Sequence, residues 1–185
     1  MSLLGAGAAT SETVVALEQV LEARERRAAR QAAALARFRR PLVSATVVMP
    51  GPVKDCLLSR RLLVKAYHEI GGVASAKAWP MLSREVFWQA TGPEAFLVVD
   101  ALPEDLKAAM IGIEACHPLG RLWDLDVVAP GPRIVSRKDL GFAPRKCLVC
   151  DLPAAECGRS RRHSLEQLLE TMQAMVDEYD RHTYT

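Results

Sequence analysis

Apolar residues recur along the first quarter of the chain with two different periods, which predict a helix followed by a strand. A long helix rich in Ala, Leu, Glu and Arg is expected from Ser11, which can serve as its N-cap, to about Phe38. Residues 42–49 form an apolar, β-branched run that predicts a buried strand, and Pro50-Gly51-Pro52 ends it. Residues 1–10 are small and are expected to be disordered.

The middle of the chain predicts two helices that alternate with three strands. The expected segments are a helix over 55–70 that stops at Gly71-Gly72, strands over 85–91 and 95–100, a helix over 103–116 and a strand over 122–128. Strand, helix, strand, strand, helix, strand is the split βαβ pattern of an α+β sandwich. We therefore predict an α+β fold with a single sheet of βαββαβ order and a leading N-terminal helix.

The last third of the chain predicts a loop, a cysteine-rich segment and a closing helix. The loop runs from Pro130 to Arg145, and Ser164 and Gln167 then have the spacing of a capping box. A helix is expected over 164–181. We predict one domain over residues 11–185, which includes a Cys/His-rich knuckle at 145–163.

The strand over 122–128 carries two carboxylates on one face. Asp124 and Asp126 alternate with Trp123, Leu125 and Val127, so they lie about 6.6 Å apart along the backbone. Two like charges raise each other's pKa unless a cation lies between them, and Mg²⁺ binds carboxylates together with substrate phosphates. The pair predicts a Mg²⁺ site for phosphoryl or nucleotidyl transfer. The alternative is a solvated strand edge whose charges deter aggregation.

Three cysteines and a histidine in the cysteine-rich segment have the spacing of metal ligands. Cys147 and Cys150 form a close pair, and Cys157 and His163 form a looser second pair, as a tetrahedral structural zinc site requires. The alternative is a set of small buried cysteines, with His163 paired to a carboxylate.

Three cations stand where a phosphate can bind. Lys54 follows Pro50-Gly51-Pro52, at the point where a strand passes to a helix N-terminus with exposed amides. Arg121 and Arg137 flank the aspartate strand and its loop. Either arginine can bind phosphate or hold the edge of the sheet.

The first helix predicts one apolar stripe that faces the protein, made of Leu17, Leu21, Ala28, Leu35 and Phe38. Arg24 and Gln31 continue this stripe, Arg27 borders it, and Arg30 lies away from it. An inward arginine is costly unless an anion meets it. We predict that Arg24 and Arg27 bind substrate phosphates, with Gln31 beside them. A salt bridge to an acidic residue such as Glu85 is the alternative.

Composition narrows the function classes. The net charge of +2 is too small to argue for nucleic acid, and 5% aromatic residues leave little to stack bases. No run has transmembrane length, and the start lacks the basic region of a signal peptide. We expect a cytoplasmic protein with reduced thiols and no membrane partner. Its five cysteines then indicate metal rather than disulfides.

Several motifs occur together in the order of one known family. They are Arg24-x-x-Arg27-x-x-x-Gln31, Pro50-Gly-Pro-Val-Lys54, Gly120-Arg-Leu-Trp-Asp-Leu-Asp-Val127, Ser136-Arg137, Arg145-Lys-Cys-Leu-Val-Cys150 and Cys157-Gly-Arg-Ser-Arg-Arg-His163. From about residue 14 to 180 the chain resembles the apo-citrate lyase phosphoribosyl-dephospho-CoA transferases, also called holo-citrate-lyase synthases.

The resemblance implies a reaction and its partners. Such enzymes transfer the phosphoribosyl-dephospho-CoA group from 2′-(5″-triphosphoribosyl)-3′-dephospho-CoA to a serine of the citrate lyase acyl carrier (gamma) subunit, releasing diphosphate. Asp124 and Asp126 would hold Mg²⁺ against the triphosphate, and one of the two would help to deprotonate the serine. Residues 11–185 are then a single catalytic domain.

The resemblance also brings in an alternative fold. A related prosthetic-group transferase of malonate decarboxylase uses a similar acidic pair, so a nucleotidyltransferase-like core is the alternative. Many nucleotidyltransferases carry a third carboxylate, for which Asp100 and Asp139 are the candidates here.

Two functions of other classes remain open at this point. A zinc-knuckle nucleic-acid binding module would use the Arg-rich first helix for phosphates, although it leaves the two strand aspartates unexplained. A non-catalytic adaptor for citrate lyase fits the same resemblance but needs no acidic pair.

Overall fold

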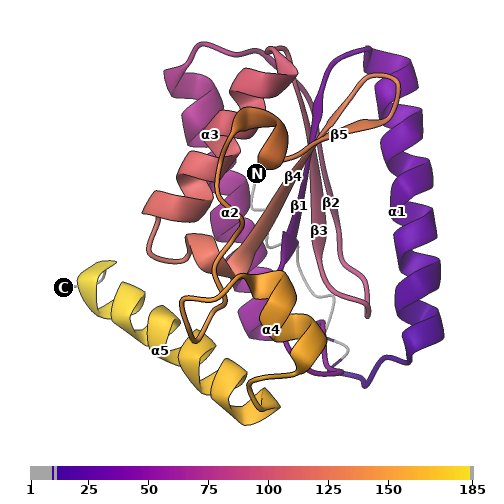
Figure 1. Ribbon diagram of the computed structural model, residues 1–185. Coiled ribbons are helices and arrows are strands. Elements are labelled where there is room, and N and C mark those ends of the chain that lie inside the picture. The colour runs from indigo at the N-terminus through magenta and orange to yellow at the C-terminus, as the bar shows by residue number, and fades with distance from the viewer. Residues whose placement is uncertain (1–9, 11, 184–185) are drawn as a thin grey trace.

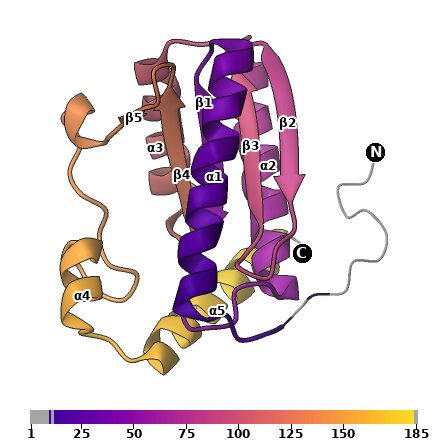
Figure 2. The same ribbon diagram turned by 90° about the vertical axis from the view of Figure 1, so that its right-hand side faces the viewer.

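A computed structural model describes residues 10 and 12–183 and shows helices on both faces of one antiparallel sheet (Figures 1 and 2). The strands of the described chain are β1 (Leu42–Val47), β2 (Met81–Phe87), β3 (Glu94–Val99), β4 (Trp123–Ala129) and β5 (Arg133–Val135). The α-helices are α1 (Leu17–Phe38), α2 (Leu57–Ala76), α3 (Pro103–Cys116), α4 (Ala154–Ser160) and α5 (Leu165–Thr183). The predicted α+β class with a single sheet is confirmed.

The sheet has the strand order β2-β3-β1-β4-β5, and every neighbouring pair is antiparallel. From β1 to β4 the elements follow one another as strand, helix, strand, strand, helix, strand. The short strand β5, which the sequence did not predict, extends the sheet beyond β4. Helix α1 covers one face of the sheet, and α2 and α3 cover the other (Figures 1 and 2).

The main hydrophobic core lies between the sheet and the pair α2 and α3. Val43 of β1 and Leu125 and Val127 of β4 point into it, and all three are fully buried. Leu62 of α2 and Met110 of α3 meet them from the helices. Because side chains alternate along a strand, the residues between these core positions must point toward α1.

The face of the sheet under α1 changes from apolar to polar along the strands. Three rows of paired residues cross it: Val98–Leu42–Val128, Phe96–Ser44–Asp126 and Glu94–Thr46–Asp124. Leu35 of α1 packs on the apolar row. An apolar helix surface cannot cover the row that carries Glu94 and Asp124, because a buried charge is costly without a partner. The polar end of this face is therefore where a site can form.

Two predictions for the first helix are wrong. The helix begins at Leu17, where the Gln19 side chain accepts a hydrogen bond of 2.8 Å from the Ala16 N–H. Ser11 and residues 1–9 lie outside the described residues. The predicted stripe is also wrong in its first half, since Leu17 and Leu21 are 68% and 47% exposed while Ala23 is buried, whereas Leu35 and Phe38 pack against the sheet as predicted.

Three further boundaries differ from the predictions. Helix α2 continues through Gly71-Gly72 to Ala76, because burial of Ala74 in the main core outweighs the helix cost of glycine, about 1 kcal/mol each. Strand β2 spans Met81–Phe87 rather than 85–91. Helix α4 forms inside the cysteine segment, where the sequence predicted none. Among the described residues, no helix combines the length and the apolar character needed to cross a bilayer.

Candidate active site

Asp124 and Asp126 project from the same face of β4, as predicted, and each side chain is about half exposed. Arg145 Nη1 lies 3.2 Å from Asp124 Oδ1, and Lys107 Nζ lies 3.9 Å from Asp126 Oδ1. Burial, and then the like charge of Asp124, raise the pKa of Asp126, while Lys107 opposes this shift. The pair is therefore close-set and open to solvent.

A pocket of about 210 Å³ lies under α1, beside Asp124. Arg24 and Arg27 of α1 line it together with Lys54, so three cations meet one carboxylate. Burial and the charge of Arg24 lower the pKa of Lys54. The buried hydroxyl of Thr91 also lines the pocket and has no hydrogen-bond partner within the described chain. Arg24 and Lys54 have no ion pair among the described residues, so this set of donors fits a polyanion such as a chain of phosphates.

Glu94 holds Arg27 in this position, and sequence reasoning missed it. Arg27 donates from Nε and Nη2 to Glu94 Oε1 at 2.9 and 2.6 Å, and Arg30 donates to Oε2 at 2.6 Å. The Glu94 side chain is only 1% exposed. The predicted outward direction of Arg30 is wrong, and the acidic partner is Glu94 rather than Glu85. Because Arg27 and Arg30 share the single carboxylate of Glu94, this group keeps a net positive charge beside the pocket.

A second pocket of about 400 Å³ lies on the other side of Asp124, beyond the edge of β4. Asp124 and Asp126 both line it, together with Arg145 and residues of the 134–144 segment. Asp124 therefore stands between two pockets, whereas Asp126 lines only the second.

Two charged side chains of α3 hold the strand between the aspartates. Lys107 Nζ donates to the carbonyl of Leu125 at 2.9 Å, and Glu114 Oε1 accepts from the Leu125 N–H at 2.8 Å. Arg137 donates to the other oxygen of Glu114. Lys107 and Glu114 are almost fully buried. They replace the neighbouring strand that β4 lacks here, since β5 pairs only with residues 127–129.

The other predicted site residues lie at the margins of this arrangement. Arg137 lines the second pocket. Gln31 and Arg121 line neither pocket, so their roles in substrate binding stay predictions; the Arg121 carbonyl accepts a hydrogen bond of 3.0 Å from Arg145. Asp100 pairs with Arg40, and Asp139 binds the Ser136 N–H. Two other carboxylates lie closer to the aspartates. Glu94 is in the same row of the sheet as Asp124, and Glu114 accepts a hydrogen bond from Leu125 between the two aspartates.

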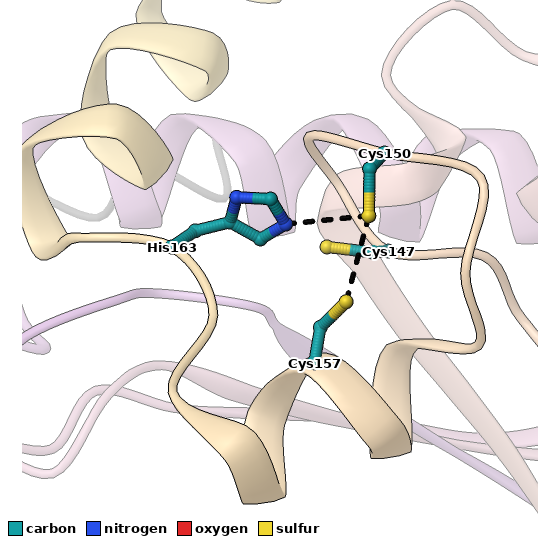
Figure 3. Close-up of side chains that lie close together, drawn as sticks. All are labelled: Cys147, Cys150, Cys157 and His163. Carbon is teal, nitrogen blue, oxygen red and sulfur yellow. Dashed lines mark hydrogen bonds between the residues drawn. The ribbon is translucent and has the colours of Figure 1, made fainter.

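Cys147, Cys150, Cys157 and His163 form a compact cluster whose potential ligand atoms all lie within 4.8 Å of one another. Cys150 Sγ lies 3.5 Å from Cys157 Sγ and 3.3 Å from His163 Nε2 (Figure 3). Cys157 enters from α4, and His163 follows that helix (Figure 3). The predicted gathering of these four residues is confirmed, and the group can hold a metal such as zinc.

The surroundings of the cysteines favour a metal-bound thiolate. Burial opposes ionisation of Cys147, but hydrogen bonds from the amides of Val149 and Cys150 and from neighbouring thiols together lower its pKa. Burial and the adjacent sulfurs raise the pKa of Cys157 to about 12. Several thiolates this close repel one another, and a cation at their centre removes the repulsion. The donor set therefore fits Zn²⁺.

Comparison with known proteins identifies the class and the family. A family model described as apo-citrate lyase phosphoribosyl-dephospho-CoA transferase matches residues 15–179. A protein of that name from Escherichia coli O9:H4 (strain HS) is 41% identical over 170 residues, 92% of this chain and 93% of the relative. The one from Citrobacter koseri is 43% identical over 166 residues, 90% of this chain and 91% of the relative. The protein is thus a transferase. It belongs to the apo-citrate lyase phosphoribosyl-dephospho-CoA transferase family.

Proposed function

We propose that the protein transfers the phosphoribosyl-dephospho-CoA group from 2′-(5″-triphosphoribosyl)-3′-dephospho-CoA to a serine hydroxyl of the citrate lyase acyl carrier subunit, releasing diphosphate. The observation that carries this proposal is the cationic pocket of Arg24, Arg27 and Lys54, which ends at Asp124. A triphosphate needs such a set of cations, and the reacting phosphorus needs carboxylates beside it.

The residues of the chain have separate tasks in this reaction. Arg24, Arg27 and Lys54 bind the two outer phosphates and stabilise the negative charge that develops on the leaving diphosphate. The serine Oγ forms a bond to the inner phosphorus, and the bond from that phosphorus to the bridging oxygen breaks. The diphosphate leaves with the electron pair, and the serine proton passes to a carboxylate. Asp126 is the better placed for this proton, because it lines only the second pocket.

We infer that Asp124 and Asp126 also hold Mg²⁺, since both are half-exposed carboxylates on one strand face. The ion, when bound, would neutralise charge on the triphosphate. For the cysteine cluster we propose a structural Zn²⁺, because its four protein ligands leave no position for water.

Two further inferences concern the type of core and the nucleic-acid binding alternative. The element order from β1 to β4 supports a split βαβ core, and the acidic pair on β4 keeps a nucleotidyltransferase-like core as the alternative. A nucleic-acid binding role is disfavoured, because Arg27 and Arg30 of α1 bind Glu94 instead of presenting a free basic stripe.

Intact-mass measurement of the carrier subunit tests the proposed function. The apo carrier is incubated with the enzyme, Mg²⁺ and the triphosphoribosyl donor. We expect the carrier to gain the mass of one phosphoribosyl-dephospho-CoA group, and the solution to gain one diphosphate per modified carrier. An unchanged carrier mass, with intact donor and demonstrated RNA binding by the protein, would favour the zinc-knuckle module.

A further inference from the structure

We propose that the second pocket, beyond the edge of β4, receives the serine-bearing segment of the acceptor protein, with Ile134 and Phe142 as its apolar contacts. The inference rests on the proposed function and assigns its two substrates to the two pockets. The polyphosphate of the donor lies under α1, and the acceptor polypeptide approaches from the opposite side of Asp124.

The geometry of substitution at phosphorus favours this assignment. The attacking and leaving oxygens lie roughly in line on opposite sides of the phosphorus. The leaving diphosphate belongs in the pocket of Arg24, Arg27 and Lys54. Asp124 is shared by both pockets, so a phosphorus held at Asp124 has the second pocket on the side away from the leaving group.

Access favours the same assignment. The first pocket lies between α1 and the sheet and has about half the volume of the second, so it offers less room for a polypeptide segment. The second pocket lies at the margin of the sheet, where β5 and the segment that follows it extend away from the body of the protein (Figure 2). A serine carried on a folded protein reaches the larger pocket at the sheet margin more readily.

The charges of the second pocket do not suit a second polyphosphate. Three of its four cations have acidic partners within the protein, since Arg137 binds Glu114, Arg145 lies 3.6 Å from Glu114, and Lys107 approaches Asp126. Only Lys138 lines the pocket without an ion pair among the described residues. Balanced charge next to apolar surface is what an uncharged stretch of polypeptide requires. In the first pocket, by contrast, Arg24 and Lys54 have no ion pair among the described residues, and Arg27 shares Glu94 with Arg30.

Two exposed apolar side chains mark the rim of the second pocket. Ile134 of β5 is 63% exposed and Phe142 is 45% exposed, and both line the pocket. Neither contributes to the buried cores, so the fold does not account for their exposure. A partner that covers them removes apolar surface from water.

Steady-state kinetics with Ile134→Ala, Phe142→Ala and the double variant test the assignment. The control is Leu82→Ala, because Leu82 is 43% exposed and lies on β2, at the opposite edge of the sheet. We expect each single variant to raise KM for the carrier by at least about fivefold, as for the truncation of an interface contact. Affinity for the donor, measured by calorimetry without carrier or added Mg²⁺, should stay within about twofold of wild type for such a remote change. The control should change neither quantity.

Opposite results would overturn the assignment. If Phe142→Ala weakens donor binding and leaves KM for the carrier unchanged, the second pocket holds part of the donor. If the double variant changes neither quantity, the pocket takes no substrate. A photoreactive phenylalanine analogue at position 142 adds a check that does not depend on truncation, since it should crosslink to the carrier while the same analogue at position 82 should not. Failure of the wild-type enzyme to modify the carrier at all would instead contradict the proposed function.

Discussion

Glu114 accepts a hydrogen bond of 2.8 Å from the backbone N–H of Leu125, the residue between the two aspartates. Its other carboxylate oxygen binds Arg137, and its side chain is 2% exposed. Lys107 completes the contact by donating to the Leu125 carbonyl. Two buried charges from α3 therefore fix the peptide that spaces Asp124 and Asp126, at the stretch of β4 that β5 does not cover.

Removal of the Glu114 carboxylate should destabilise the fold. Glu114→Ala leaves Arg137 without its buried partner, and such a loss costs about 3–5 kcal/mol. Glu114→Gln keeps an acceptor for the Leu125 N–H and should cost less. Urea denaturation measures both effects, with Glu104→Gln as the control, because the Glu104–Arg133 pair is exposed. Equal midpoints for Glu114→Ala and Glu104→Gln would show that the clamp is dispensable.

Arg24 and Arg27 should respond differently to truncation. Arg24 is exposed at the pocket, so Arg24→Ala should weaken donor binding about tenfold or more, the value of a charge-assisted hydrogen bond, with little change in Tm. Arg27 also binds buried Glu94, so Arg27→Ala should additionally lower stability by about 1.5–3 kcal/mol. Arg37→Ala is the matched control on the same helix, because Arg37 is exposed and lines neither pocket. Normal donor affinity in Arg24→Ala would remove Arg24 from the site.

The lowered pKa of Lys54 predicts a pH dependence of diphosphate binding. Burial and the charge of Arg24 favour loss of the proton, so the ammonium becomes neutral at a lower pH than an ordinary lysine. Diphosphate affinity should fall as the pH rises through this lowered pKa. Lys54→Arg should retain affinity over the same range, because a guanidinium stays protonated. Titration calorimetry at a series of pH values checks this, and parallel profiles for the two proteins would be the contrary result.

The cysteine cluster should bind about one zinc per chain and stabilise the C-terminal third. Metal analysis of protein purified without added zinc measures the first, and thermal unfolding with and without a chelator measures the second. Cys157→Ser should abolish the metal, whereas Cys116→Ser should not, since Cys116 is exposed and outside the cluster. Loss of metal should also lower activity, because Arg145 lies only two residues before Cys147 and contacts Asp124. A metal-free protein that is folded and fully active would refute the zinc assignment.

The periodic features of the fold could be predicted from the sequence, whereas the inward face of the first half of α1 could not. The alternation in residues 122–128 placed Asp124 and Asp126 on one strand face, and the motif spacing gathered the four ligands of the Cys/His cluster. The spacing of apolar residues along α1 predicted that Leu17 and Leu21 face the protein. The helix instead buries Ala23, and Arg27, which was predicted to face inward toward phosphates, pairs with Glu94 across 67 positions of sequence. No local sequence pattern can indicate a contact between residues so far apart in the chain.

The buried carboxylates beside the site, Glu94 and Glu114, could not be identified from the sequence either. Glu94 and Glu114 stand in an apolar strand and an amphipathic helix, where each resembles an ordinary surface carboxylate. Only the strand register and the packing of α3 on β4 show that both are buried beside the aspartates. The clue in the sequence was Glu94 itself, a charge at the start of a run that is otherwise apolar through Val99.

The central claim is that Asp124 and Asp126 are required for transfer. It is tested most directly by measuring transfer with Asp124→Asn and Asp126→Asn. At saturating donor, carrier and Mg²⁺, we expect both variants to lose transfer to the carrier, measured by intact mass, because each lacks a carboxylate beside the reacting phosphorus. Asp126→Asn should keep or slightly raise the Tm at neutral pH, since the raised pKa of Asp126 means that its charged form is disfavoured in the folded protein. That gain should vanish as the pH falls and Asp126 of the wild type becomes protonated. Near-normal turnover in both folded variants would contradict the account.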